Sequence, residues 1–135
     1  MCLISKWRFP RIASGNIECY KVLYKEGNKY ITPYMDAEVD INKPLKAKGR
    51  SITFGVGDPY EKTTGYIHTY TSLNAVKRLY TGILKDPNIV IFRCIIPTGT
   101  KYHISTGELE YCSKQIKFIK QIPSYEIYNI HRWFL

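Results

Sequence analysis

Alternating or clustered hydrophobic residues mark about six stretches of this chain as β-strands. Residues 17–24 alternate, and the two faces of this strand would be Tyr20, Val22 and Tyr24 against Cys19, Lys21 and Leu23. Residues 88–96 form a nearly continuous apolar run, which is typical of a central strand that is buried on both faces. The remaining stretches are 29–34, 65–70, 102–104 and 111–122.

One stretch has helical periodicity. Thr71 or Ser72 is a suitable N-cap, and Gly82 suits the C-terminal end of a helix. The apolar residues between them share one helical face: Leu73, Val76, Leu79 and Tyr80. We therefore expect one main helix at about 72–82. One helix among about six strands predicts an α+β fold with a bent, mostly antiparallel sheet.

Two stretches lack a regular pattern. Residues 1–15 are expected to form an irregular arm that Trp7 and Phe9 dock onto the body. Residues 35–64 hold several Pro and Gly residues and are expected to form a long irregular excursion. Such an excursion is often functional in a compact domain, and the alternative is a surface connection. The chain 1–135 has no linker and is short enough to form a single small domain.

The charge of the chain favours anionic partners. Its 20 Lys and Arg residues outnumber 11 Asp and Glu residues, for a net charge of +9. That balance attracts an anionic small molecule, nucleic acid or an acidic protein, although a solvated basic surface has the same composition. The 12 tyrosines offer flat, amphipathic contact area for a planar ring or a partner.

The sequence lacks the patterns that are typical of a membrane span, a signal peptide or a metal site. No apolar run approaches the length of a membrane span and no signal-peptide pattern is present, so we expect a cytoplasmic protein without a membrane partner. The four cysteines are widely spaced and the three histidines are scattered, so no metal site is predicted. Cys19 and Cys94 lie in apolar strand patterns and are expected to be core residues.

The candidate ligand site centres on His68, at a strand end just before the predicted helix. Its imidazole can donate or accept a hydrogen bond, and a helix N-terminus favours phosphate. We expect a cleft between residues 65–72, the strand near Tyr20 and Lys21, and part of residues 43–60. The predicted ligand-binding residues are Tyr20, Lys21, Arg50, His68, Thr69, Tyr70, Thr71 and Ser72. The alternatives are a backbone-satisfying His68 and surface charges at the two basic positions.

Glu108 and Glu110 form a Glu-x-Glu pair that offers a catalytic alternative. In a strand, both carboxylates would face the same side. One would then orient a ribose hydroxyl while the other stabilises a developing positive charge. The alternative is a charge pair at the tip of a hairpin, which the turn signal Thr106-Gly107 favours.

Four motifs follow one another between residues 17 and 119. They are Tyr20-Lys21-Val22-Leu23, then Gly65-Tyr66-Ile67-His68-Thr69-Tyr70, then the strand 90–96 with Pro97-x-Gly99-x-x-Tyr102, and last Tyr111-x-Ser113-x-x-Ile116. In this order they resemble a group of small uncharacterised proteins of Bacteroidetes bacteria and their phages. The resemblance implies a phage-type protein, and no activity comes with it.

The order of three residue groups is also similar to that of the ADP-ribosyltransferase fold. There, a first strand carries His or Arg, a middle strand carries hydroxyl or Tyr residues before a helix, and a late strand carries Glu. The corresponding groups here are Tyr20-Lys21, Thr69-Tyr70-Thr71-Ser72 and Glu108-x-Glu110, so that the first position departs from the pattern. This resemblance implies NAD as cofactor, Glu110 as catalytic carboxylate, and His68 or Tyr70 as positioning residues.

Three function hypotheses follow. The first is a non-enzymatic cytosolic binding protein that needs no cofactor and holds an anionic ligand. That ligand would be a nucleotide-like signal, sequestered against a host defence if the source is a phage, or an acidic surface of a host protein. The second is an ADP-ribosyltransferase-like enzyme. The third is a binder of single-stranded nucleic acid that uses Lys charge and Tyr stacking.

Overall fold

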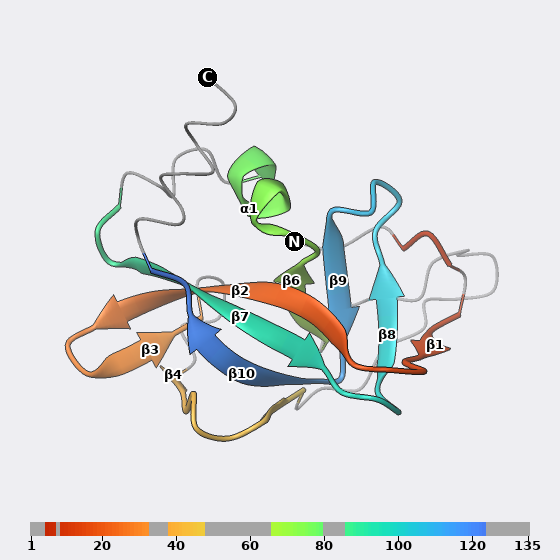
Figure 1. Cartoon of the computed structure of the whole chain (residues 1–135), viewed down its shortest axis with the longest axis horizontal. Helices are drawn as coiled ribbons and strands as arrows, with labels where there is room; N and C mark the ends of the chain where they lie inside the picture. Colours follow the sequence, from red (N-terminus) through yellow and green to blue (C-terminus); the bar gives the residue numbers. More distant parts are fainter. Residues whose placement is uncertain (1–4, 8, 33–37, 48–65, 80–85, 124–135) are drawn as a thin grey trace, which may run out of the picture.

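The structure, a computed structural model, describes residues 5–7, 9–32, 38–47, 66–79 and 86–123 (Figure 1). These ranges contain, in chain order, β1 (Arg11–Ile12), β2 (Ile17–Glu26), β3 (Lys29–Ile31), β4 (Glu38–Val39), β5 (Leu45–Lys46), β6 (Ile67–Tyr70), α1 (Leu73–Leu79), β7 (Ile89–Ile96), β8 (Lys101–Ile104), β9 (Glu110–Ser113) and β10 (Gln115–Gln121). The expected small, sheet-dominated α+β domain is confirmed.

The described ranges hold more strands than the pattern predicted. Three of the additional strands, β1, β4 and β5, have only two residues each, which is too short to show a period in the sequence. The fourth arises because the stretch expected at 111–122 is divided at Lys114 into β9 and β10. Two short strands thus lie within the stretch expected to be an irregular excursion, of which residues 35–37 and 48–64 lie outside the described ranges.

All described strand pairs are antiparallel. The order across the sheet is β1-β8-β9-β6-β2-β7-β10-β5, and β3 and β4 continue from β2. The longest ladder joins β2 to β7, from Ile17 opposite Ile96 to Tyr24 opposite Ile89. As expected, β7 lies centrally, between β2 and β10, because its apolar residues need cover on both faces.

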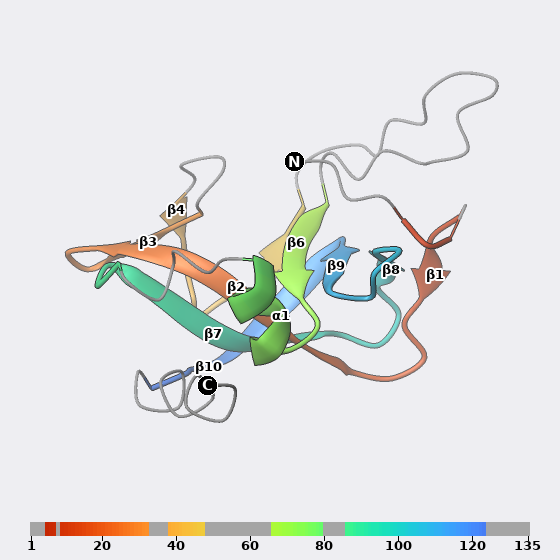
Figure 2. The ribbon, with the colours of Figure 1, turned by 90° about the horizontal axis from the view of Figure 1, so that it is seen from above.

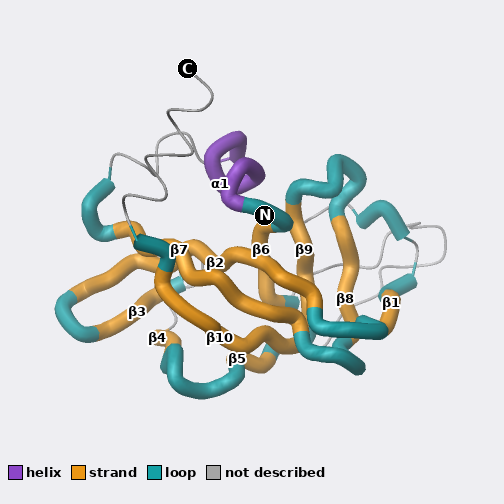
Figure 3. The backbone as a smooth tube through the Cα atoms, in the orientation of Figure 1, coloured by secondary structure: helices purple, strands orange, loops and turns teal. Residues whose placement is uncertain are grey.

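The connection between β9 and β10 shows that the sheet is strongly curved. Lys114 alone separates these strands in the chain, yet β6, β2 and β7 lie between them in the sheet. One chain can run from β9 into β10 only if the sheet curls until these two strands approach each other. Figure 3 shows the strands as one curved layer with α1 beside it. The curvature separates an inner face from an outer face.

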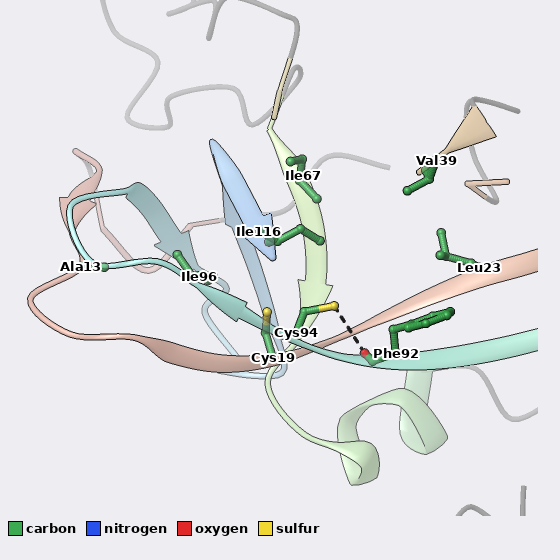
Figure 4. Close-up of a cluster of buried hydrophobic side chains, with 9 residues drawn as sticks. All are labelled: Ala13, Cys19, Leu23, Val39, Ile67, Phe92, Cys94, Ile96 and Ile116. Atoms are coloured by element: carbon green, nitrogen blue, oxygen red, sulfur yellow. Dashed lines mark hydrogen bonds between the residues drawn. The ribbon is translucent and has the colours of Figure 1, made fainter. Parts of the chain in front are cut away.

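The inner face carries the larger core cluster. Its buried members, shown in Figure 4, are Ala13, Cys19, Leu23, Val39, Ile67, Phe92, Cys94, Ile96 and Ile116. In that view they project from the sheet on the side away from α1. The alternation expected for β2 is confirmed, since Cys19 and Leu23 belong to this cluster while Val22 belongs to the other one.

The outer face packs against α1, which lies near β2 and β6 in both ribbon views (Figure 1 and Figure 2). The buried residues there are Val22, Tyr70, Ala75, Val76, Ile91 and Ile122. The helix begins as predicted, because the Ser72 hydroxyl accepts a 3.0 Å hydrogen bond from the Ala75 N–H. Leu79 is 42% exposed, so the expected apolar helix face is only partly buried. Residues 80–82 lie outside the described ranges.

In its described residues, 5–7 and 9–15, the N-terminal segment is more regular than expected. Trp7 packs edge-on against Tyr102 with 5.2 Å between ring centroids, and Arg11 lies 4.0 Å from the Trp7 ring centre. Arg11 also belongs to β1, which pairs with β8. Trp7 therefore docks the segment as predicted, whereas Phe9 is 70% exposed. Within the described ranges, no helix has the length and apolar character that a membrane crossing requires.

Candidate functional site

Strands β2 and β6 bring the predicted ligand-binding residues together, but on two opposite faces of the sheet. The two strands pair at Tyr20 and Tyr70. Successive side chains of a strand point to opposite faces. Lys21 and Thr69 therefore lie on the inner face, whereas Tyr20, His68 and Tyr70 lie on the outer face. A compact ligand would contact one of these two sets, so each set is considered as a separate site.

The inner-face set begins with Lys21. Its ammonium donates a 2.7 Å hydrogen bond to the main-chain carbonyl of His68. The residue is only 9% exposed, and no carboxylate of the described residues forms an ion pair with it. Burial, by removing water from the charged form, lowers the pKa of Lys21 to about 8. A buried cation that lacks a counter-charge is unusual, because its desolvation is uncompensated.

Thr69 supplies a second buried donor beside Lys21. The residue is 1% exposed, and its hydroxyl has no hydrogen-bond partner of ordinary geometry among the described residues. Interaction with the Thr69 hydroxyl lowers the pKa of the Cys19 thiol against the larger effect of burial, but a thiol is a weak hydrogen-bonding group. Buried hydroxyls are nearly always paired, so an unpaired one calls for an explanation. The inner face thus presents an ammonium and a hydroxyl that the described protein groups do not saturate.

Two cysteines form the surroundings of this pair. Cys19 and Cys94 lie directly opposite each other on β2 and β7, and both are fully buried and free. Burial raises the pKa of the Cys19 thiol to about 12 and raises that of Cys94 further. Both thiols therefore stay un-ionised, and their prediction as core residues is confirmed. No three His, Cys, Asp or Glu side chains of the described ranges are placed to hold a metal ion.

The outer-face set is a row of side chains across four neighbouring strands. Glu110 lies opposite Tyr70, Tyr70 opposite Tyr20, and Tyr20 opposite Arg93. Glu110 is half-buried, and this burial raises the pKa of its carboxyl group. At the other end, the Tyr20 hydroxyl donates to Glu18 at 2.8 Å, and Arg93 lies 3.3 Å from the same carboxylate oxygen. Burial, together with the bond to Glu18, raises the pKa of Tyr20 to about 12.

The two hydroxyls that precede the helix have protein partners. Thr71 donates a 2.9 Å hydrogen bond to the carbonyl of Glu108, and Ser72 caps the helix. To donate to a ligand, Thr71 would have to give up its bond to Glu108, whereas Ser72 only accepts in its contact with Ala75. Glu108 itself lies in the turn before β9, with a positive φ of 57°. Its exposed carboxylate pairs with Lys6 at 2.7 Å, and this contact lowers the pKa of Glu108.

The other Glu of the pair behaves differently. Glu110 is part of β9, so the two carboxylates do not share a strand face. The same-face arrangement that the two carboxylates would have within one strand is therefore absent, and only Glu110 joins the other predicted residues. The reason is the turn at residues 105–108, where the Glu108 N–H bonds the Ser105 carbonyl at 2.9 Å. This matches the hairpin-tip alternative for Glu108.

Two histidines lie on β6 and β8, the strands that flank β9. His68 is half-buried and lies opposite Cys112, which in turn lies opposite His103 on β8. His103 is fully buried, and its Nδ1 lies 2.7 Å from the hydroxyl of Ser5. Sequence reasoning assigned no role to His103, because only the strand order reveals its neighbours. Arg50 and the part of the predicted cleft at 48–60 lie outside the described ranges.

No protein-family model, curated protein sequence or solved structure matches this chain.

Proposed function

We propose that this protein is a non-enzymatic, cytoplasmic binding protein for a small anionic ligand, held at the inner face by Lys21 and Thr69. The observation that carries the proposal is a buried ammonium without a counter-charge next to a buried hydroxyl without a partner, within the described part of the chain. Each group is costly to bury in this state. An anionic oxygen would satisfy both at once.

The chemistry of the site favours a phosphate or carboxylate group. Lys21 has three N–H donors, and the carbonyl of His68 uses one of them. The Thr69 hydroxyl adds a neutral donor. The un-ionised Cys19 and Cys94 thiols introduce no competing negative charge. The anion of a nucleotide-like signal has the required acceptors, and the net charge of +9 would draw it toward the protein.

Isothermal titration against a panel of cyclic nucleotides and ADP-ribose derivatives tests the proposal. Lys21→Met should weaken binding about 10- to 100-fold, the scale of one hydrogen bond to a charged group. Lys101→Met is the matched control, since it removes the same charge from an exposed position and should leave affinity unchanged. Affinity should also fall as the pH rises through about 8, where Lys21 loses its proton. No binding at millimolar ligand, or equal losses in both variants, would refute the proposal.

A second candidate function is favoured by the outer-face row. An ADP-ribosyltransferase-like enzyme needs a carboxylate near hydroxyl or Tyr groups on adjacent strands, and Glu110, Tyr70 and Tyr20 supply such a set on β9, β6 and β2. These residues would fit NAD, with Glu110 binding a ribose hydroxyl. The cofactor would supply the ADP-ribosyl group. The half-buried Glu110 would hold its hydrogen bond in a partly water-excluded setting.

The enzyme candidate is tested by incubation with labelled NAD and a host lysate. Glu110→Gln should abolish transfer of label, and Glu108→Gln should not, because Glu108 is exposed and paired with Lys6. Equal labelling by wild type and Glu110→Gln would exclude this function. Label transfer that is lost only in Glu110→Gln would favour it over the binding protein.

A further inference from the structure

Lys21 differs from the other described lysines in its surroundings. Lys25, Lys101, Lys117 and Lys120 are exposed, whereas Lys21 points into the core of a curved sheet. Its one acceptor in the described ranges is a neutral carbonyl, so no negative charge holds the proton on its nitrogen. An amine in such a place is the kind that reacts as a nucleophile, because burial disfavours its charged form.

We propose that Lys21 is a reactive amine that condenses with the carbonyl group of a small anionic aldehyde or 2-oxo acid to form an imine. The inference rests on the proposed function, since it names the substrate class of the same inner-face site. The ligand would bring an anionic group, which the remaining donors bind, and a carbonyl carbon for attack by the Lys21 nitrogen.

The reaction balances without an added reagent. The nitrogen lone pair attacks the carbonyl carbon and a C–N bond forms, while the carbonyl oxygen becomes a hydroxyl. Both hydrogens of the neutral amine leave with that oxygen as one water molecule, and a C=N bond remains. Nothing is oxidised or reduced, and the step is reversible by hydrolysis.

The surroundings suit each stage of this condensation. Burial lowers the pKa of Lys21 to about 8, so the neutral amine is roughly 300-fold more abundant at pH 7 than for a lysine with the ordinary value of 10.5. The unpartnered Thr69 hydroxyl can donate to the oxygen that leaves as water. The Cys19 and Cys94 thiols stay protonated and thus compete poorly for the carbonyl carbon.

The test uses glyoxylate, which carries both an aldehyde and a carboxylate, with cyanoborohydride to reduce any imine. After brief treatment of the full-length protein at pH 7, peptide mapping should find the adduct on Lys21 well before any other lysine, on the order of 100-fold faster than on Lys101. Lys21→Arg should remove the fast adduct, and Lys101→Met should retain it. Labelling of Lys21 that is no faster than that of Lys101 would overturn the inference.

Two further readouts separate this inference from the proposed function. The first is nucleotide binding by the wild type, measured by titration separately from the glyoxylate adduct, because the proposed binding needs no imine. Binding of a nucleotide by wild type without a fast Lys21 adduct would leave the proposed function standing and overturn the reactive amine. If an excess of the bound nucleotide suppresses the fast adduct, both the proposed function and the reactive Lys21 amine are supported. This competition uses the wild type alone, so it does not depend on how well a variant folds.

Discussion

The Lys21 ammonium donates to the main-chain carbonyl of His68 across 2.7 Å, one residue beyond the point where β2 and β6 pair. If the register of Tyr20 and Tyr70 continued, Lys21 would lie opposite Thr69. The pairing instead stops, and a side chain supplies the donor to a carbonyl of β6. The inner-face donors Lys21 and Thr69 therefore lie where the pairing between β2 and β6 ends.

The stability of the protein should depend on pH through Lys21. Its pKa is about 8 in the folded state and 10.5 when unfolded, so the unfolded state binds more protons between these values and stability rises with pH. Between pH 7 and 9 the wild type should gain about 1 kcal/mol relative to Lys21→Met, measured by urea unfolding. Above about pH 9 the Cys19 thiol would ionise in the unfolded state and lower the stability of both proteins, so the comparison ends there. Parallel pH profiles would show that Lys21 is not desolvated.

Replacement of Thr69 by Val should separate binding from stability. The variant removes a buried hydroxyl that has no partner in the described ranges and keeps the shape of the side chain. Unfolding free energy should stay constant or rise by about 1 kcal/mol, while affinity for the anionic ligand falls. Thr69→Ser keeps the hydroxyl and is the control for binding. A loss of stability in Thr69→Val would mean that the hydroxyl is bonded in the folded protein.

Loss of the helix cap should affect stability alone. In Ser72→Ala the Ala75 N–H loses its 3.0 Å acceptor, and the unfolding free energy should fall by about 1 kcal/mol. Ser72→Asp keeps an acceptor and should unfold like the wild type. Titration with the anionic ligand should show equal affinity for all three proteins. Weaker binding by Ser72→Ala at unchanged stability would instead place this hydroxyl in the ligand site.

The N-terminal segment should loosen when Ser5 is changed. Its hydroxyl lies 2.7 Å from the buried Nδ1 of His103 and accepts a 3.0 Å hydrogen bond from the Trp7 N–H. Ser5→Ala should cost about 1–3 kcal/mol and speed amide hydrogen exchange at residues 5–7 and in β8. Thr106→Ala, at an exposed turn position, is the control and should change neither quantity. Unchanged exchange in Ser5→Ala would show that other contacts hold the segment.

Much of the fold was predictable from local patterns. The alternation in residues 17–24 correctly assigned Cys19 and Leu23 to one face and Val22 to the other. The apolar run at 88–96 correctly predicted a central strand, and Ser72 correctly predicted the start of the helix. Two-residue strands such as β1 and β5 carry no period, so pairing partners alone reveal them.

The candidate site was predictable only in part. Residues 20–21 and 68–72 were expected to adjoin, and β2 and β6 do pair. The expected single site overlooked the consequence of strand alternation, which sends Lys21 and Thr69 inward and Tyr20 and Tyr70 outward. The row from Glu110 to Arg93 depends on the order of four strands, and that order is set by contacts between residues far apart in the chain.

Hydrophobic period and capping chemistry were enough to assign this chain to a sheet-rich α+β class, because both act between residues that are close in sequence. Tertiary structure alone decided that the sheet curls until β9 and β10, separated by Lys114 alone, approach each other. It also decided that Lys21 meets the carbonyl of His68 with no carboxylate beside it in the described ranges. Burial and charge pairing depend on which distant strands become neighbours, and a local pattern does not contain that information. Both proposals depend on the burial and charge pairing of the Lys21 amine. These are therefore properties of the folded sheet.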